Sequence, residues 1–142
     1  MLVAMLPSQV GDYWPFIVRT LEDSLPPVAS GTSYDLNQIM YSLMVGLMQG
    51  WVVMNKEQAN KGIVITTINR DHSGVATLLV YSAIILENTA ANDWFSGYDT
   101  LVKFAHSKGC AKIGAYVKDK KILALLKEQD FETESVFAYK DI

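Results

Sequence analysis

Few side chains in this sequence combine the chemistry and the spacing that a metal site or a nucleophilic mechanism needs. His72 and His106 are the two histidines, and neither has a carboxylate or a second histidine at ligand spacing. No metal site is therefore expected. Cys110, the single cysteine, follows Gly109 at the start of an expected strand. A nucleophilic thiol would need a histidine partner such as His106, but a small buried apolar residue is also common in this position.

Lysine is the reactive residue type that is concentrated in one part of the chain. Seven lysines and one acidic residue lie between Lys103 and Lys127, a local charge of +6, whereas residues 1–60 carry −3. The lysines could hold a phosphate group, contact an acidic protein or another copy of the chain, or form a solvated face. The whole chain has a net charge of −3, and the lysines are not interleaved with aromatic residues, so nucleic acid is not an expected partner.

Length and composition are those of one folded domain over residues 1–142. Half of the residues are apolar and 19% are charged, which excludes disorder and favours a large core or a buried interface. A single cysteine suits a reducing, cytoplasmic place of synthesis. Residues 1–6 lack the features of a signal peptide, and the longest apolar stretch, 75–86, is too short to span a membrane. We therefore expect no membrane partner.

Turn signals and apolar periodicity predict the elements. Asp12 is expected to cap the first helix, Ser33 the second and Asp119 the last, and Gly50 is expected to end the second helix. The expected order is a strand (1–6), a turn (7–11), a helix (12–25), a loop (26–33), a helix (33–50), three antiparallel strands (51–54, 62–68 and 75–86), a helix (94–109), a strand (112–117), a helix (119–126) and a final strand or hairpin (131–140).

Methionine is concentrated on the expected second helix. Met40, Met44 and Met48 lie on neighbouring turns of this helix, and a stripe of this kind is usually part of a core. Met48 and Tyr41 fall outside the main apolar stripe, and methionine adapts well to interfaces. Part of this helix is therefore expected to be a contact surface.

The order of elements resembles that of the GNAT family, the Gcn5-related N-acetyltransferases. The sequence from Leu101 to Ile113 is similar to that of the family's third helix, which runs through a Gly-Cys turn into its fifth strand. Residues 122–131 look like the fourth helix and the step that follows it. The resemblance implies an α+β fold with three layers, α/β/α. Its central mixed sheet is mostly antiparallel, and strands 4 and 5 part in a V.

The resemblance implies acetyl-coenzyme A (acetyl-CoA) in this V, with its pyrophosphate on backbone amides where the third helix begins. The family's loop has the pattern Arg or Gln-x-x-Gly-x-Gly or Ala. This sequence has neither glycine, Thr89 replaces the leading residue, and Asp93 would repel phosphate. We therefore expect no cofactor, with acetyl-CoA as the alternative. The matching positions are Thr89, Ala90, Ala91, Asn92, Asp93 and Trp94.

The resemblance also implies a tyrosine on the fourth helix as general acid, but this sequence has Leu126 there, and leucine cannot donate a proton. Tyr116 and Tyr139 are candidate substitutes, although strand tyrosines are often core residues. Glu87 is the candidate general base, with a solvated glutamate at a strand end as the alternative.

Two functions follow from these residues. The first is a GNAT-like domain with an eroded acetyl-CoA site that binds other proteins or copies of itself. In this reading the chain is similar in character to bacteriophage virion or morphogenesis proteins, and a place in a virion is expected. The alternative is an active, acetyl-CoA-dependent N-acetyltransferase with a divergent loop. A small regulatory binder that keeps the cleft for another ligand is a third reading.

Overall fold

A computed structural model describes residues 1–24, 26, 29, 33–57, 60–85 and 91–142 of the chain. Its centre is a five-stranded sheet in the order β1-β2-β3-β4-β5. The first four strands pair antiparallel, and β5 pairs parallel to β4. The strands are β1 (Leu2–Ala4), β2 (Met48–Met54), β3 (Asn60–Arg70), β4 (Ala76–Ile85) and β5 (Lys112–Ala115).

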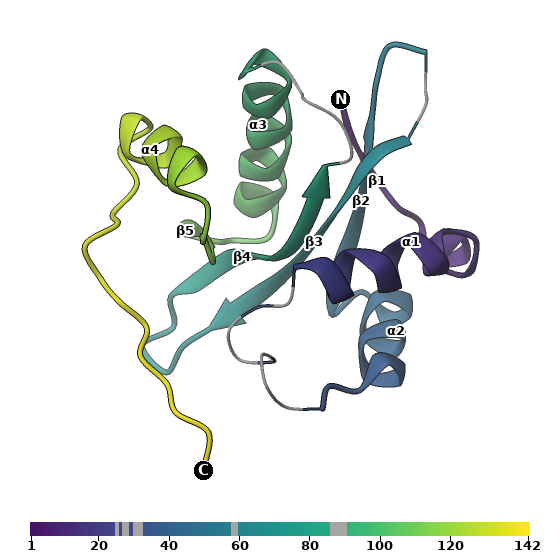
Figure 1. Ribbon diagram of the computed structural model, residues 1–142, viewed down its shortest axis with the longest axis horizontal. Coiled ribbons are helices and arrows are strands. Elements are labelled where there is room, and N and C mark those ends of the chain that lie inside the picture. The colour runs from purple at the N-terminus through teal and green to yellow at the C-terminus, as the bar shows by residue number, and fades with distance from the viewer. Residues whose placement is uncertain (25, 27–28, 30–32, 58–59, 86–90) are drawn as a thin grey trace.

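Helices cover both faces of the sheet, which gives the expected three layers. Figure 1 shows α1 and α2 on one side of the sheet and α3 and α4 on the other. A short 3-10 helix, η1, precedes α1. The helices are η1 (Pro7–Gln9), α1 (Val10–Asp23), α2 (Leu36–Val45), α3 (Ala91–Ser107) and α4 (Lys120–Glu128). None of the described helices is long and apolar enough to cross a membrane.

The core is divided by the sheet into two clusters of buried side chains. Under α3, the Trp51 ring meets Phe104 edge-on, with centroids 5.1 Å apart. The Trp51 indole N–H donates to the Thr66 hydroxyl at 2.9 Å, and this hydroxyl donates to Gln49 at 2.9 Å. Under α1 and α2, the cluster contains Val10, Ile17, Leu21, Ile39, Leu43, Val52, Ile63 and Ile65.

Local capping signals explain where α4 begins and where α3 ends. Asp119 caps α4 as expected, because its carboxylate accepts hydrogen bonds from the N–H groups of Lys121 and Ile122. After α3, Gly109 has a φ of 73°, the left-handed conformation that ends many helices.

The second helix is shorter than the sequence predicts, and Ser33 and Gly50 do not bound it. Asp35 is the cap, and Gly46, with a φ of 83°, ends the helix after Val45. The chain then turns directly into β2, so Met48 and Gly50 are strand residues and not helix residues. Here the left-handed glycine prevails over the longer apolar pattern. Similarly, α1 begins at Val10, before the expected cap Asp12.

The expected strand over 131–140 does not form, and this prediction is wrong. Residues 131–142 follow α4 without joining the sheet. A strand needs a neighbouring strand for its backbone hydrogen bonds, and this segment has none among the described residues. In Figure 1 the segment runs from α4 past the β3–β4 hairpin and away from the body.

Candidate functional site

The candidate site lies where β4 and β5 part. The two strands pair over Thr77–Val80 and Lys112–Ala115, and β4 then continues to Ile85 without β5. This is the V that the sequence resemblance implies between strands 4 and 5. Beyond the last pair, the backbone groups of β4 have no strand partner on that side among the described residues. Such groups can bind a ligand or another segment.

A β-bulge marks the point of separation. Ile65 pairs with Ser82 and Thr66 pairs with Val80, so Tyr81 is an extra residue in β4. Tyr81 packs against the core cluster under α1 and α2, and Ser82 bonds to α1, so two consecutive side chains face the same layer. Bulges are common next to functional sites because they redirect side chains.

Hydroxyl groups fix the bulge to the end of α1. The Ser82 and Ser24 hydroxyls are 2.6 Å apart, and the Ser82 hydroxyl also donates to the Ser24 carbonyl at 3.0 Å. The Ser24 hydroxyl donates in turn to the Thr20 carbonyl at 2.9 Å. Ser82 and Thr20 are buried, so these groups are protected from water. The bulge therefore has a fixed position relative to α1.

Two tyrosines lie where the strands part, Tyr81 in the bulge of β4 and Tyr116 directly after β5. Burial raises the pKa of the Tyr81 phenol, and the nearby Tyr116 and Tyr34 raise it further. Tyr81 therefore keeps its proton well above neutral pH and can act there as a hydrogen-bond or proton donor. The Tyr116 ring lies 6.4 Å from Phe137, and Phe137 stacks on Tyr139 at 5.9 Å.

The structure links two of the sequence-derived candidates. Tyr116 follows β5 and Tyr139 lies in the segment after α4, and Phe137 connects their rings. Tyr34 and Tyr81 were missed by sequence reasoning, because nothing in the apolar pattern around Tyr81 signals a bulge. Glu87, Thr89 and Ala90 lie outside the described residues.

The remaining positions of the expected phosphate loop, 91–94, form the first turn of α3. Backbone N–H groups in a first turn are free to bind an anion. However, the residues there include no glycine, and Asp93 adds a negative charge at the third position.

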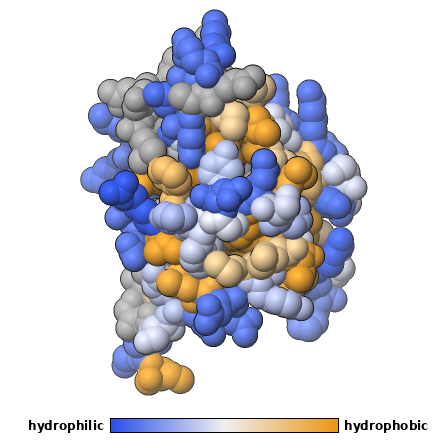
Figure 2. Space-filling view, turned by 90° about the vertical axis from the view of Figure 1, so that its right-hand side faces the viewer, coloured by the Kyte–Doolittle hydropathy of each residue, from blue (hydrophilic) through white to orange (hydrophobic). Residues whose placement is uncertain are grey.

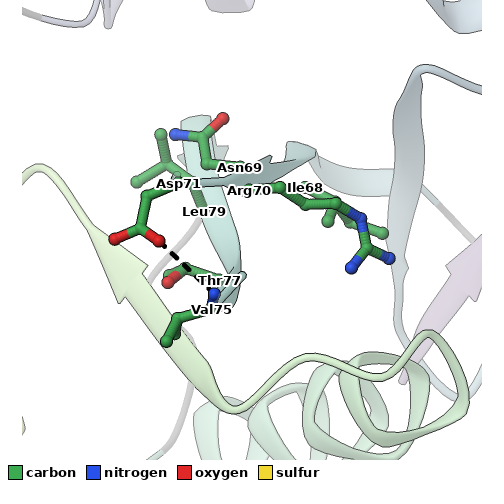
Figure 3. Close-up of a pocket in the computed structure, with 7 residues that line it drawn as sticks. All are labelled: Ile68, Asn69, Arg70, Asp71, Val75, Thr77 and Leu79. Carbon is green, nitrogen blue, oxygen red and sulfur yellow. Dashed lines mark hydrogen bonds between the residues drawn. The ribbon is translucent and has the colours of Figure 1, made fainter. Parts of the chain in front are cut away.

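A hollow lies at the opposite end of β4, beside the β3–β4 turn. Its volume is about 520 Å³. The Asp71 carboxylate accepts hydrogen bonds from the N–H groups of Ser73 and Val75 and from the Ser73 hydroxyl, which lower its pKa. In Figure 3 Asp71 points to Val75, and Arg70 points the other way. Asp71 therefore stabilises the hairpin. The lining residues are Ile68, Asn69, Arg70, Asp71, Val75, Thr77 and Leu79.

The end of α2 carries an exposed apolar patch, here called the α2 patch, formed by Tyr41, Met44, Val45 and Leu47. Tyr41 is 59% exposed and Leu47 62%. Tyr41, Met44 and Val45 share one helix face, since they are three and four residues apart. A hollow of about 330 Å³ lies beside Tyr41. Figure 2 looks onto the side with α1 and α2 and shows apolar groups there between polar ones.

No candidate metal site is found among the described residues. Among the described residues, no three histidine, cysteine, aspartate or glutamate side chains are grouped so that they could hold a metal ion. Cys110 is a buried free thiol between α3 and β5. It packs with the cluster under α3, in agreement with the interpretation of this cysteine as a core residue.

Known structures share this fold over the whole chain. A ribosomal-protein-alanine N-acetyltransferase from Brucella melitensis biovar Abortus 2308 has a TM-score of 0.67 and 12% identity over 100% of this chain and 99% of that one. An aminoglycoside acetyltransferase from an uncultured soil metagenomic sample has a TM-score of 0.73 and 9% identity, and the match covers 100% of this chain and 97% of that one. A third structure is AAC(6')-Iy in complex with the bisubstrate analogue CoA-S-monomethyl-acetylneamine. Its TM-score is 0.69 and its identity 11%, and the match covers 100% of this chain and 97% of that one.

The fold is therefore GNAT-like, as the sequence resemblance implies. No family model matches the sequence, and no curated protein matches it. At these identities the similarity establishes the fold, and the chemistry must be argued from this chain's own residues.

Proposed function

We propose that this protein is a GNAT-like domain that binds other proteins and does not transfer acetyl groups. The observation that carries the proposal is the α2 patch, where Tyr41, Met44, Val45 and Leu47 are more than half exposed. Side chains of this kind cost free energy in water, about 25 cal/mol for each Å² of apolar surface, and a partner would remove that cost. Contiguous apolar patches mark interaction sites. This is the role expected of an assembly component, such as one in a virion.

The first turn of α3 supports the absence of acetyl transfer. Asp93 at its third position would repel the two phosphates of coenzyme A, and no glycine is present there to allow close approach. On α4, Leu126 stands at the position where the resemblance implies a proton donor.

Calorimetric titration with acetyl-CoA tests this proposal. We expect no heat of binding at millimolar ligand and no rise in melting temperature, because a ligand that binds only the native state must stabilise it. Asp93→Gly is the matched variant, since it removes the repelling charge and supplies a glycine. Micromolar binding by the natural sequence would overturn the proposal.

A contact role for the α2 patch can be tested on the protein itself. Met44→Lys and Leu47→Lys should lower the binding of the dye ANS, which reports exposed apolar surface, without lowering the melting temperature. Lys103→Met, on exposed α3 surface, is a control for the change of charge. Unchanged dye binding in both patch variants would argue against a continuous apolar surface.

An acetyltransferase is the second candidate, and the bulge at Tyr81 favours it. Tyr81 and Tyr116 place phenol groups where β4 and β5 part, and such groups can hold a proton near a reacting atom. If acetyl-CoA binds, Tyr81→Phe and Tyr116→Phe would each be assayed for acetyl transfer to amines, with Tyr41→Phe as the control variant away from the V.

A further inference from the structure

Three aromatic side chains lie next to one another at the surface, and they are here called the aromatic row. The Tyr116 ring lies 6.4 Å from Phe137, and Phe137 stacks on Tyr139, with centroids 5.9 Å apart and ring planes at 27°. Tyr116 is 36% exposed, Phe137 59% and Tyr139 55%. Exposed aromatic surface costs free energy in water, so such a row suits a ligand with flat faces of its own.

The aromatic row begins on the face of the sheet that carries α1 and α2. In β5, Ile113 packs with the cluster under α3. Because side chains alternate along a strand, Lys112 and Gly114 belong to the opposite face, and a further step of alternation brings Tyr116 to that face. The effect of Tyr116 on the pKa of Tyr81 agrees with this placement, because Tyr81 packs with the cluster under α1 and α2. A lysine, a glycine and a tyrosine therefore follow one another along one face.

The sheet beside the aromatic row carries polar groups and an open position. Lys112 pairs with Thr77 of β4, and Thr77 pairs with Asn69 of β3. Cross-strand partners share a face, so an ammonium, a hydroxyl and an amide group lie side by side across three strands. Gly114 has no side chain, and therefore β5 places nothing on this face between Lys112 and the Tyr116 ring. A flat group can reach the ring from that side.

Positive charge flanks Tyr116 along the chain. Residues 112–121 contain four lysines and one acid, a local charge of +3. Among the described residues, none of these lysines forms an ion pair with a carboxylate. Asp71 lies near Lys112, but its carboxylate accepts hydrogen bonds from its own turn, and Asp119 caps α4. The four lysines are exposed: Lys112, Lys118, Lys120 and Lys121.

The fold brings together residue types that lie apart in the chain. Phe137 and Tyr139 follow α4, whereas the lysines of 112–121 precede it or belong to its first turn. The expectation against nucleic acid rests on the lack of aromatic residues between the lysines and on the net charge of −3. The contact of Phe137 with Tyr116 removes the first argument. The second describes the whole chain, and residues 112–121 have the opposite sign.

A single strand of nucleic acid matches this surface better than a duplex or an acidic polypeptide. A duplex offers phosphates to the lysines, but its bases are stacked inside and cannot reach the aromatic row. An acidic polypeptide offers carboxylates without the flat faces that stack on aromatic rings. A single strand has both phosphates and unpaired bases, and proteins hold such strands with positive charge and stacking rings.

We propose that the aromatic row and the lysines within residues 112–121 bind single-stranded nucleic acid without preference for its sequence. The bases stack on the rings, and the lysines hold the phosphates. This activity goes beyond the proposed binding of proteins, because it uses neither the α2 patch nor the first turn of α3. The outcome of the acetyl-CoA titration therefore does not bear on it.

Fluorescence anisotropy with a labelled oligodeoxythymidine of about 15 nucleotides tests the proposal. We expect saturable binding at micromolar protein in about 50 mM salt, and a steep loss of affinity as salt is added. A duplex of the same length should bind several times more weakly, because it offers no free bases. No binding of the single strand at low salt, or equal binding of the duplex, would overturn the proposal.

Removal of single rings locates the strand on the surface. Phe137→Ala and Tyr139→Ala should each weaken binding about tenfold, which is within the range measured for base stacking. Phe16→Ala removes a ring that is 43% exposed on α1 and is the matched control, which should bind as the natural chain does. Melting temperatures show that the variants are folded. Unchanged affinity in both row variants would mean that the strand binds elsewhere, and the proposal would fail.

The salt dependence of the affinity tests the lysines. Each phosphate contact contributes about −0.7 to the slope of log affinity against log salt for a single strand. Lys112→Gln and Lys118→Gln should each make the slope shallower by about this amount. Lys56→Gln, at an exposed position before β3, should leave it unchanged. Equal slopes for all three variants would contradict a role of these lysines.

Competition with poly-glutamate separates a nucleic-acid surface from one that binds acidic proteins. At equal concentration, poly-glutamate of similar length should not displace the oligonucleotide, because it has no bases for the aromatic row. Displacement at equal concentration, together with a loss of poly-glutamate binding in Phe137→Ala, would identify an acidic polypeptide as the ligand and would overturn the proposal.

Discussion

The body of the sheet and the region after β5 are packed very differently. In the body, Ile65 and Leu78 are fully buried, and no described side-chain polar atom is both buried and unpaired. After β5, α4 has no buried residue, and residues 131–142 have no strand partner in the part of the chain that the structure describes. The backbone hydrogen bonds of a helix lie within one segment, whereas those of a strand need a partner strand.

The largest expected effect is a core truncation in the body. Leu78→Ala should lower the free energy of unfolding by about 2–5 kcal/mol, because it leaves a cavity under α3. Leu125→Ala, on the exposed side of α4, is the matched control and should cost well under 1 kcal/mol. Urea denaturation measures both. Equal losses would mean that the two regions are not packed differently.

Removing a buried hydroxyl should have the next largest effect. Ser82→Ala takes away the partner of Ser24, and breaking such a buried pair costs about 1–3 kcal/mol. Ser107→Ala, whose hydroxyl is exposed at the end of α3, should be almost neutral. The thermal unfolding midpoints compare the two variants, and a neutral Ser82→Ala would show that the bulge is not fixed by these hydroxyls.

Loss of the α4 cap should be a local effect. Asp119→Ala removes the acceptor for the N–H groups of Lys121 and Ile122 and should cost the helix about 0.5–2 kcal/mol. Hydrogen exchange should then become faster in α4 and stay unchanged in β3. Equal acceleration in both would mean that α4 unfolds only together with the body.

Acidification should have the smallest effect, at the β3–β4 turn. Hydrogen bonds from Ser73 lower the pKa of Asp71 in the folded state. The stabilising contribution is therefore present above the ordinary aspartate pKa and is lost as the pH falls through the lowered value. NMR should show the Ser73 amide shift titrating below the usual range for aspartate, and Ser73→Ala should move that titration upward.

Local signals in the sequence were sufficient for most of the fold. Asp119 and Gly109 set helix ends through their own side chain or backbone, and the β-branched runs indicated β3 and β4. The bulge at Tyr81 could not be predicted, because it depends on the register between two strands. The failure at 131–140 has the same cause, since strand-forming residues show that a segment can pair but not where its partner is.

The candidate site was predictable only in part. Tyr116 was found because a tyrosine in an expected strand could replace the missing proton donor, but its effect on Tyr81 depends on contacts between residues far apart in sequence. Glu87 remains a sequence-based prediction.

The packing of Trp51 gives the molecule a built-in optical reporter. Its indole is 4% exposed, donates to Thr66 and meets the edge of Phe104 on α3. Indole emission depends on polarity and on neighbouring groups, so a movement of α3 against the sheet would shift its wavelength or intensity. Events at the V, which α3 borders, can therefore be followed by emission without an added label, provided that Trp14 and Trp94 are replaced.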